Sequence, residues 1–268
     1  MFAEATLKGV VDERIWRYDN TTYFRLKVSA RSRHQADSLF TVALPKNVSR
    51  SMPRSLRPGI SVSVSTMPRL REMDETLAMF IKNAAGEPPQ LNGFDAAQLH
   101  VRRLQTDFVA KAIFILDEPD AAQATATLSG IVDQRIWIYE DMLHFRLRVL
   151  HRPEDTDTGR PEMSFFTVVV PRGTTKAMPQ RLETGDRAVV EATLQQREHT
   201  ETLATFLINA VGDKPDLGDY DATQLRVPRT KIDFVVTTMI IRPAVEVVTE
   251  AAAIVAAPDF TEAAVVSV

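Results

Sequence analysis

Residues 5–28 of the chain read ATLKGVVDERIWRYDNTTYFRLKV, and residues 126–149 read ATLSGIVDQRIWIYEDMLHFRLRV. Aligned at an offset of 121 residues, the two stretches are identical at 14 of 24 positions. Each alternates apolar and polar residues, breaks at Asp19-Asn20 or at Glu140-Asp141, and then alternates again. A period of two predicts half-buried strands, and the identity between the stretches predicts that one β-unit occurs twice in the chain.

Apolar runs with strand-like patterning follow each unit in the same order. They lie at 38–44, 59–65, 76–81 and 107–116 in the first copy, and at 165–170, 185–192, 202–207 and 233–241 in the second. A charged reversal is expected at 71–75, and loops are expected at 86–105 and 212–231. The last run of each copy is interpreted as a sixth strand, although so short a run also fits a buried helix.

The order of these strands predicts the fold class. Three strands, a short connector and a two-stranded hairpin fit the five-stranded OB barrel. Gly9 and Gly130 stand in the first strand, where a small barrel needs a sharp bend that a residue without Cβ permits. We therefore expect an all-β protein with two tandem OB-fold (five-stranded Greek-key) barrels, each with an added C-terminal strand segment. SH3-like barrels and β-sandwiches share the strand count and stay open as alternatives.

The repeat also divides the chain of 268 residues. We expect a first OB-fold repeat at 1–118, a second at 119–242, and a flexible, acidic, Ala/Val-rich tail at 243–268. The first repeat has 17 Lys and Arg against 13 Asp and Glu, the second has 15 against 18, and the tail has none against 4. Because the charge is graded in this way, the total of −3 decides neither for nor against a nucleic-acid ligand.

The sequence offers no constellation typical of an enzyme. There is no cysteine, so disulfides and thiolate chemistry are excluded. The five histidines show no HxH or HxxxH spacing, and no glycine loop that could cradle phosphate is present. Asp157-Thr158-Gly159 lies in a polar loop and not in the apolar strand that an aspartic protease requires. We expect no catalytic residue, no metal and no cofactor.

Two further absences concern location. The start of the chain lacks a basic segment followed by an apolar segment, and no run of about 18 apolar residues exists. The expectation is a cytoplasmic protein without a membrane partner.

Rings and cations share one face of the second strand. Alternation turns Phe24 and Leu26 toward the core and Arg25 toward solvent. Cations pair with phosphates and rings stack on bases, at about 1–3 kcal/mol per stacked base. The alternative is that the two tryptophans cap the cores and the cations form a solvated face. The candidate nucleic-acid-binding residues from the first two strands and the following hairpin are Arg14, Trp16, Tyr23, Arg25, Lys27, Arg69 and Arg71, and in the second copy Arg135, Trp137, His144, Arg146, Arg148 and Arg197.

Two copies of a Leu-x-Gly-φ-φ-Asp strand, beginning at Leu7 and Leu128, precede the aromatic and basic second strand. This pattern resembles bacterial single-stranded DNA-binding proteins, and two OB folds in one chain are similar to the Deinococcus–Thermus type. The resemblance implies sequence-tolerant binding of single-stranded DNA in replication, recombination or repair. It also implies a homodimer that presents four OB folds.

The chain departs from that family at its end. Family members usually close on an acidic tip with Pro-Phe that recruits replication or repair proteins, whereas here Pro258-Asp259-Phe260 is followed by eight more residues. Recruitment of such partners is therefore not implied. An OB-type protein-interaction or assembly module, or a binder of RNA or oligosaccharide, stays open because a fold does not fix its ligand.

Overall fold

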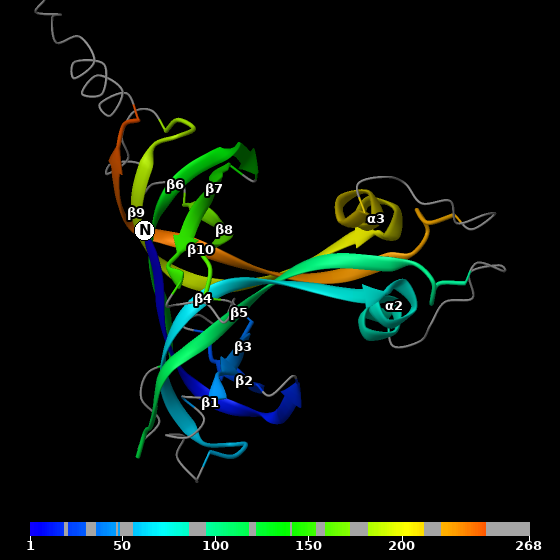
Figure 1. Ribbon diagram of the computed structural model, residues 1–268, viewed down its shortest axis with the longest axis horizontal. Coiled ribbons are helices and arrows are strands. Elements are labelled where there is room, and N and C mark those ends of the chain that lie inside the picture. The colour runs from blue at the N-terminus through cyan, green and yellow to red at the C-terminus, as the bar shows by residue number, and fades with distance from the viewer. Residues whose placement is uncertain are drawn as a thin grey trace, which may run out of the picture.

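The computed structural model describes residues 1–18, 21–30, 36–46, 48, 56–85, 95–117, 122–139, 141–153, 159–171, 182–211 and 221–244. The expected tail from 245 onward lies outside them. The first repeat contains β1 (Phe2–Tyr18), β2 (Thr21–Val28), β3 (Ser38–Leu44), β4 (Ser61–Thr76), α2 (Leu77–Ala85) and β5 (His100–Ile115) (Figure 1). The second contains β6 (Gln123–Tyr139), β7 (Met142–His151), β8 (Glu162–Val170), β9 (Arg187–Thr202), α3 (Leu203–Val211) and β10 (Arg226–Arg242). Neither helix in this part of the chain has the length and apolarity to cross a bilayer.

Five strands close each repeat into a barrel. Strand β1 pairs with β2 and β4, β2 pairs with β3, β3 runs parallel to β5, and β5 returns to β4. The same pairings recur among β6 to β10. This is the order of the OB barrel, so the expected all-β fold with tandem OB barrels is confirmed. The long first strand serves both ends of its barrel, and its register to β2 shifts between Val11 and Ile15.

The two glycines of the first strands have a steric role. A Cβ at Gly9 would lie 2.2 Å from the carbonyl oxygen of Lys27, and a Cβ at Gly130 would lie 2.4 Å from that of Arg148. No side chain fits at such distances, so glycine lets the first and second strands approach where the barrel closes.

Equivalent phenylalanines fill the two barrel cores. Phe40 packs edge-on against Phe108 with ring centroids 5.3 Å apart, and Phe166 packs against Phe234 at 5.0 Å. The alternation predicted for the second strand is confirmed, since Phe24 and its equivalent Phe145 are fully buried.

The prediction of strands at 76–81 and 202–207 is wrong, because both segments are helical from their second residue onward. In α2 the buried residues Leu77, Phe80 and Ile81 are spaced by three and four positions, which is the period of a helix and not of a strand. Thr76 caps the helix, since its Oγ1 accepts the backbone N–H of Met79 at 3.3 Å. Thr202 caps α3 in the same way.

The expected hairpin is in fact a long two-stranded arm. The charged residues 71–75 do not form a reversal but continue β4, which pairs with β5 as far as Thr76 and His100. The expected loops at 86–105 and 212–231 overlap β5 and β10, while 86–94 and 212–220 lie outside the described residues. The supposed sixth strand is therefore the fifth strand of the barrel, and the described residues contain no added strand segment beyond it. Figure 1 shows both arms projecting from the barrels with α2 and α3 near their ends.

The two repeats pair through their first strands about a local two-fold axis. Strand β1 is antiparallel to β6, and Ala5 lies opposite Ala126, its own equivalent in the repeat. The pairs Phe2↔Ser129 and Lys8↔Gln123 are likewise exchanged by the 121-residue offset. The interface is thus self-complementary, as in a symmetric dimer, and it joins the barrels into one ten-stranded sheet.

The arms repeat this symmetry at their tips. Phe80 of α2 stacks on Phe206 of α3 with ring centroids 4.0 Å apart and planes 8° from parallel, and these two residues are equivalents at the 126-residue offset. Around them lies a second core formed by Leu77, Ile81, Val101, Leu203, Leu207 and Val227. This cluster fixes the two arms to each other at a distance from the barrels.

Candidate nucleic-acid interface

A ladder of rings and charges crosses the outer face of the first barrel. Trp16 lies opposite Tyr23 in the β1–β2 register, and their rings stack with centroids 5.6 Å apart and planes 13° from parallel. The guanidinium of Arg71 lies 5.0 Å from the Tyr23 ring, and its Nε is 2.5 Å from a carboxylate oxygen of Asp107. Tyr23 is buried beneath these neighbours, while Trp16 is half-buried and Arg14 is exposed beside it.

The second barrel has a ladder at equivalent positions. Trp137 stacks on His144 at 5.4 Å and 17°, and it keeps 38% of its surface exposed. Tyr139 meets His144 edge-on at 6.0 Å, and the guanidinium of Arg197 lies 5.5 Å from the Tyr139 ring. Arg197 Nε is 2.9 Å from Asp233, which repeats the Arg71–Asp107 pair. The ladder is thus conserved between the repeats, with a different ring beneath the arginine.

The acid at the base of the first ladder is buried. Burial raises the pKa of the Asp107 carboxyl above its ordinary value, although Arg71 and the amide of Gln105 act in the opposite direction. The Gln105 amide donates a hydrogen bond to this carboxylate at 3.1 Å. Asp107 therefore holds Arg71 over the tyrosine, and Arg71 is not the freely available cation that the sequence suggested. The same holds for Arg197.

The two predicted cations of β2, Arg25 and Lys27, differ in exposure. Lys27 is exposed, and its ammonium lies 3.0 Å from Asp37. The pKa of Asp37 is lowered, first by the backbone N–H of Ala30 and then by Lys27. The side chain of Arg25 is half-buried.

The matching cations of β7 are partly covered. The guanidinium of Arg146 lies 4.5 Å from the Phe165 ring and 3.9 Å from Asp133, and Arg148 is half-buried. The side chain of Arg135 lies outside the described residues. The sequence did not single out Phe165 or Tyr139, yet both rings contact the predicted arginines. Phe165 lies opposite Arg148 in the β7–β8 register, two residues from Arg146, whereas Tyr139 and Arg197 are not paired in the sheet, so no local pattern indicated their contact.

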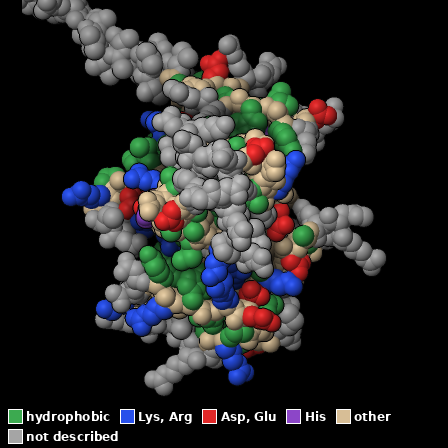
Figure 2. Space-filling model, turned by 90° about the vertical axis from the view of Figure 1, so that its right-hand side faces the viewer, with side chains coloured by type: hydrophobic (Ala, Val, Ile, Leu, Met, Phe, Trp, Pro, Cys, Tyr) green, Lys and Arg blue, Asp and Glu red, His purple; other side chains and the backbone are tan. Residues whose placement is uncertain are grey.

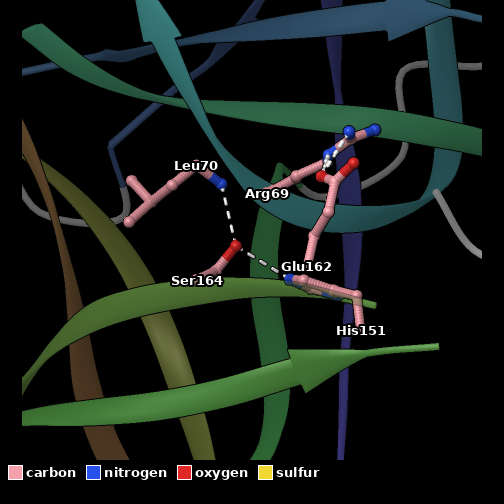
Figure 3. A network of polar contacts seen from close by, with 5 residues as sticks. All are labelled: Arg69, Leu70, His151, Glu162 and Ser164. Atoms are coloured by element: carbon pink, nitrogen blue, oxygen red, sulfur yellow. Dashed lines mark hydrogen bonds and ion pairs between the residues drawn. The ribbon is translucent and has the colours of Figure 1, made fainter. Parts of the chain in front are cut away.

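Arg69 does not belong to the ladder. Its Nη2 and Nε donate to one Glu162 oxygen of β8, at 2.5 and 2.9 Å, so it joins the two repeats (Figure 3). In the same network the Leu70 N–H donates to Ser164 Oγ at 3.1 Å, and Ser164 Oγ lies 2.8 Å from His151 Nε2. Arg69 is therefore paired with an acid of the other repeat, and its expected contact with phosphate stays a prediction.

This contact has a partner across the two-fold axis. The backbone N–H of Gln196 donates to Ser38 Oγ at 3.3 Å, which is the equivalent of the Leu70–Ser164 bond. The ion pair has no such equivalent, because Gln195 and Ala36 stand where Arg69 and Glu162 stand in the other half. The junction is symmetric in its backbone bonds and asymmetric in its charge.

The charges elsewhere are mixed. On the face that Figure 2 shows, Lys and Arg side chains alternate with Asp and Glu side chains and do not form a field of one sign. Within the described ranges, no group of three or more His, Asp or Glu lies together as metal ligands would. The rings, with cations beside them, are thus the distinctive chemistry of the outer faces.

Comparisons with known proteins place the fold. No family model and no curated protein matches the chain. The wild-type single-stranded DNA-binding protein of Thermus aquaticus aligns with a TM-score of 0.50 and 12% identity, over 90% of this chain and 92% of that one. The chain has the tandem-barrel fold of that protein. A deletion mutant of the same protein gives a TM-score of 0.51 and 13% identity, over 90% of this chain and 94% of that one. Identity this low establishes the fold alone.

Proposed function

We propose that the chain binds single-stranded DNA without sequence preference, on the outer faces of both barrels. The observation that carries this proposal is the duplicated ladder, in which a partly exposed tryptophan stacks on a second ring beside an arginine. A ring face accepts any base, so stacking is tolerant of sequence, and neighbouring cations contact the backbone. The fold shared with a single-stranded DNA-binding protein over nine-tenths of both chains supports the same conclusion.

Each ladder offers an upper ring for stacking. Trp16 and Trp137 lie outermost, over Tyr23 and His144, so a base can extend the existing stack without a rearrangement of the core. The exposed cations Arg14 and Lys27 lie on the same side of the first barrel. Such a protein would cover transiently unpaired DNA during replication, recombination or repair.

The proposal extends to a homodimer with four barrels. The strands β5, β4, β1, β6, β9 and β10 form one continuous antiparallel surface across both repeats. On its outer side, Phe2, Val189 and Ile240 lie in one cross-strand row with 45%, 38% and 62% of their surface exposed, and Phe114 is 61% exposed at the opposite end. Apolar residues this exposed on a flat sheet fit a second copy of the same surface.

Fluorescence anisotropy of labelled oligonucleotides tests the binding. We expect oligo-dT to bind tightly at low salt and the logarithm of the affinity to fall linearly with the logarithm of the salt concentration, because cations are released from phosphates. A duplex of equal length should bind far more weakly, and oligo-rU measures the preference between DNA and RNA. Failure of both single strands to bind, or tight binding of a neutral oligosaccharide instead, would exclude the proposal.

A further inference from the structure

The arm of the second repeat carries basic groups that the arm of the first lacks. In β9 and β10, Arg197 lies directly opposite Lys231, and His199 lies directly opposite Arg229. The equivalent pairs in the first arm are Arg71 with Gln105 and Met73 with Arg103. In these two pairs the arms therefore differ at two positions, where Lys231 stands in place of a glutamine and His199 in place of a methionine.

This arrangement is unfavourable in the protein alone. Like charges directly opposite each other on a sheet are destabilising. The two arginines are neutralised, since Arg229 Nη1 lies 2.7 Å from Glu201 and Arg197 lies 2.9 Å from Asp233. Within the described residues, Lys231 forms no ion pair, and the buried Nδ1 of His199 has no hydrogen-bond partner. The acids near Lys231 and His199, which are Glu201 and Asp233, are thus already paired with the two arginines.

The pKa values of Lys231 and His199 are both lowered by their surroundings. Partial desolvation lowers the pKa of the Lys231 ammonium, and Arg229 and Arg197 lower it further, while Glu201 and Asp233 act in the opposite direction. Burial lowers the pKa of His199, and Lys231 adds to the effect. An anion placed between them would favour the charged forms of both groups.

The basic groups continue the second ladder. Arg197 lies 5.5 Å from the Tyr139 ring, which touches His144 beneath Trp137, and Lys231 lies across the arm from Arg197. A strand whose bases stack on the exposed rings of this ladder would bring its next phosphates over the arm. Stacking rings and phosphate-binding cations then follow one another along one path.

We propose that Lys231, His199 and Arg229 form a phosphate-binding site on the β9–β10 arm that the first repeat does not possess. The identity of the phosphate as part of a DNA strand rests on the proposed function, whereas the site itself does not. Because the first arm has Gln105 and Met73 at the equivalent positions, the site makes the second repeat the one that holds the strand beyond its barrel.

Replacement by the residues of the first arm tests the site with little risk to folding. Lys231→Gln and His199→Met install side chains that the other arm already carries at these positions. In the full chain, the slope of log affinity against log salt for oligo-dT should lose about 0.7 on Lys231→Gln, the value for one phosphate contact on a single strand. Arg226→Gln is the matched control, because Arg226 is exposed on the opposite face of the same arm.

The reciprocal change provides a gain of binding. The double variant Gln105→Lys with Met73→His builds the same cluster on the first arm and should raise the slope by about 0.7. An unchanged slope in both Lys231→Gln and the reciprocal variant, with normal oligo-dT binding, would overturn the site and leave the proposed function intact.

Tripolyphosphate separates the site from the DNA. It carries phosphates but no bases, so it should raise the Tm of the full chain, and Lys231→Gln should lose that increase while Arg226→Gln keeps it. If oligo-dT does not bind but this pattern holds, the site binds free polyphosphate and the proposed function fails. If Lys231→Gln and the unmodified chain respond equally to tripolyphosphate, the site is absent.

Discussion

At the scale of single residues, the ladders show how one position sets the character of each barrel. Tyr23 and His144 are equivalents, and each lies beneath a tryptophan. With tyrosine in this place the arginine above it lies on the same ring, whereas with histidine the arginine lies on the neighbouring Tyr139. The second ladder is therefore longer by one ring, although both ladders end at equivalent arginines.

His199 predicts a dependence of stability on pH. Its pKa in the folded chain lies below the ordinary 6.5, because of burial first and then of Lys231, Arg229 and Arg197, with Glu201 acting oppositely. As the pH falls below about 6.5, the unfolded chain takes up this proton before the folded chain does, so the free energy of unfolding decreases until the folded pKa is passed. Urea unfolding of His199→Met at pH 7.5 and 5.5 should show a smaller acid-induced loss than the unmodified chain. His100→Gln is the control, and equal losses in all three proteins would contradict the prediction.

The sequence predicted the outward alternation of Tyr23, Arg25 and Lys27 because it depends only on the period of a strand. It could not predict that Arg71 and Arg69 are already paired, because their acids, Asp107 and Glu162, are distant in sequence. Cations chosen from a pattern are thus an upper limit on those that remain available to a ligand.

At the scale of elements, the close approach of first and second strands is the tightest constraint. Gly9→Ala places a methyl group 2.2 Å from a backbone carbonyl oxygen, which the barrel can relieve only by opening the β1–β2 pairing. We predict that Gly9→Ala and Gly130→Ala each lower the free energy of unfolding by about 1–3 kcal/mol, as measured by urea titration. Ser63→Ala in the adjacent strand is the control, and a loss no larger than in this control would show that the strands separate easily.

The helices at the arm tips yield a second prediction. Phe80→Ala and Phe206→Ala should each lower the free energy of unfolding by about 3–5 kcal/mol, because both rings are buried in the second core. The double variant should cost less than the two losses added, since both substitutions remove one stack. Met79→Ala, at an exposed position of α2, should change stability by no more than about 0.5 kcal/mol. Strict additivity would mean that the rings do not support each other.

These helices also mark the limit of prediction from the sequence. Leu77 to Ile81 is apolar at every position, and such a continuous run fits a buried strand as well as a buried helix, so strand was the wrong choice. The threonine caps at the two helix starts were a usable local signal. Their packing on the opposite arm is a tertiary effect that no local pattern reveals.

At the scale of the whole molecule, the repeat seen in the sequence becomes a two-fold axis in space. The duplication itself was readable, but the edge pairing of Ala5 with Ala126 and the stack at the arm tips required coordinates. A chain of this kind resembles a dimer joined by a linker, but its two halves can differ in sequence. The ion pair of Arg69 and the additional lysine at Lys231 are two such differences.

The exposed outer sheet predicts that two such chains associate. Light scattering after size-exclusion chromatography should give twice the chain mass of 30.0 kDa. Phe114→Asp with Ile240→Asp should return the mass to that of one chain, since a carboxylate opposes burial of this surface, and oligo-dT binding should persist. A monomeric unmodified protein, or a dimer indifferent to these substitutions, would contradict the assembly proposed for this face.

The two tryptophans allow the most direct test, because the chain has only two and one lies in each ladder. Trp16→Phe and Trp137→Phe each leave a single emitting ring, which reports on one barrel. We predict that saturating oligo-dT quenches the fluorescence of both variants, that added salt reverses the quenching, and that duplex DNA of equal length causes little. Unchanged emission from both variants at an oligo-dT concentration that saturates binding would show that the strand does not lie on these faces.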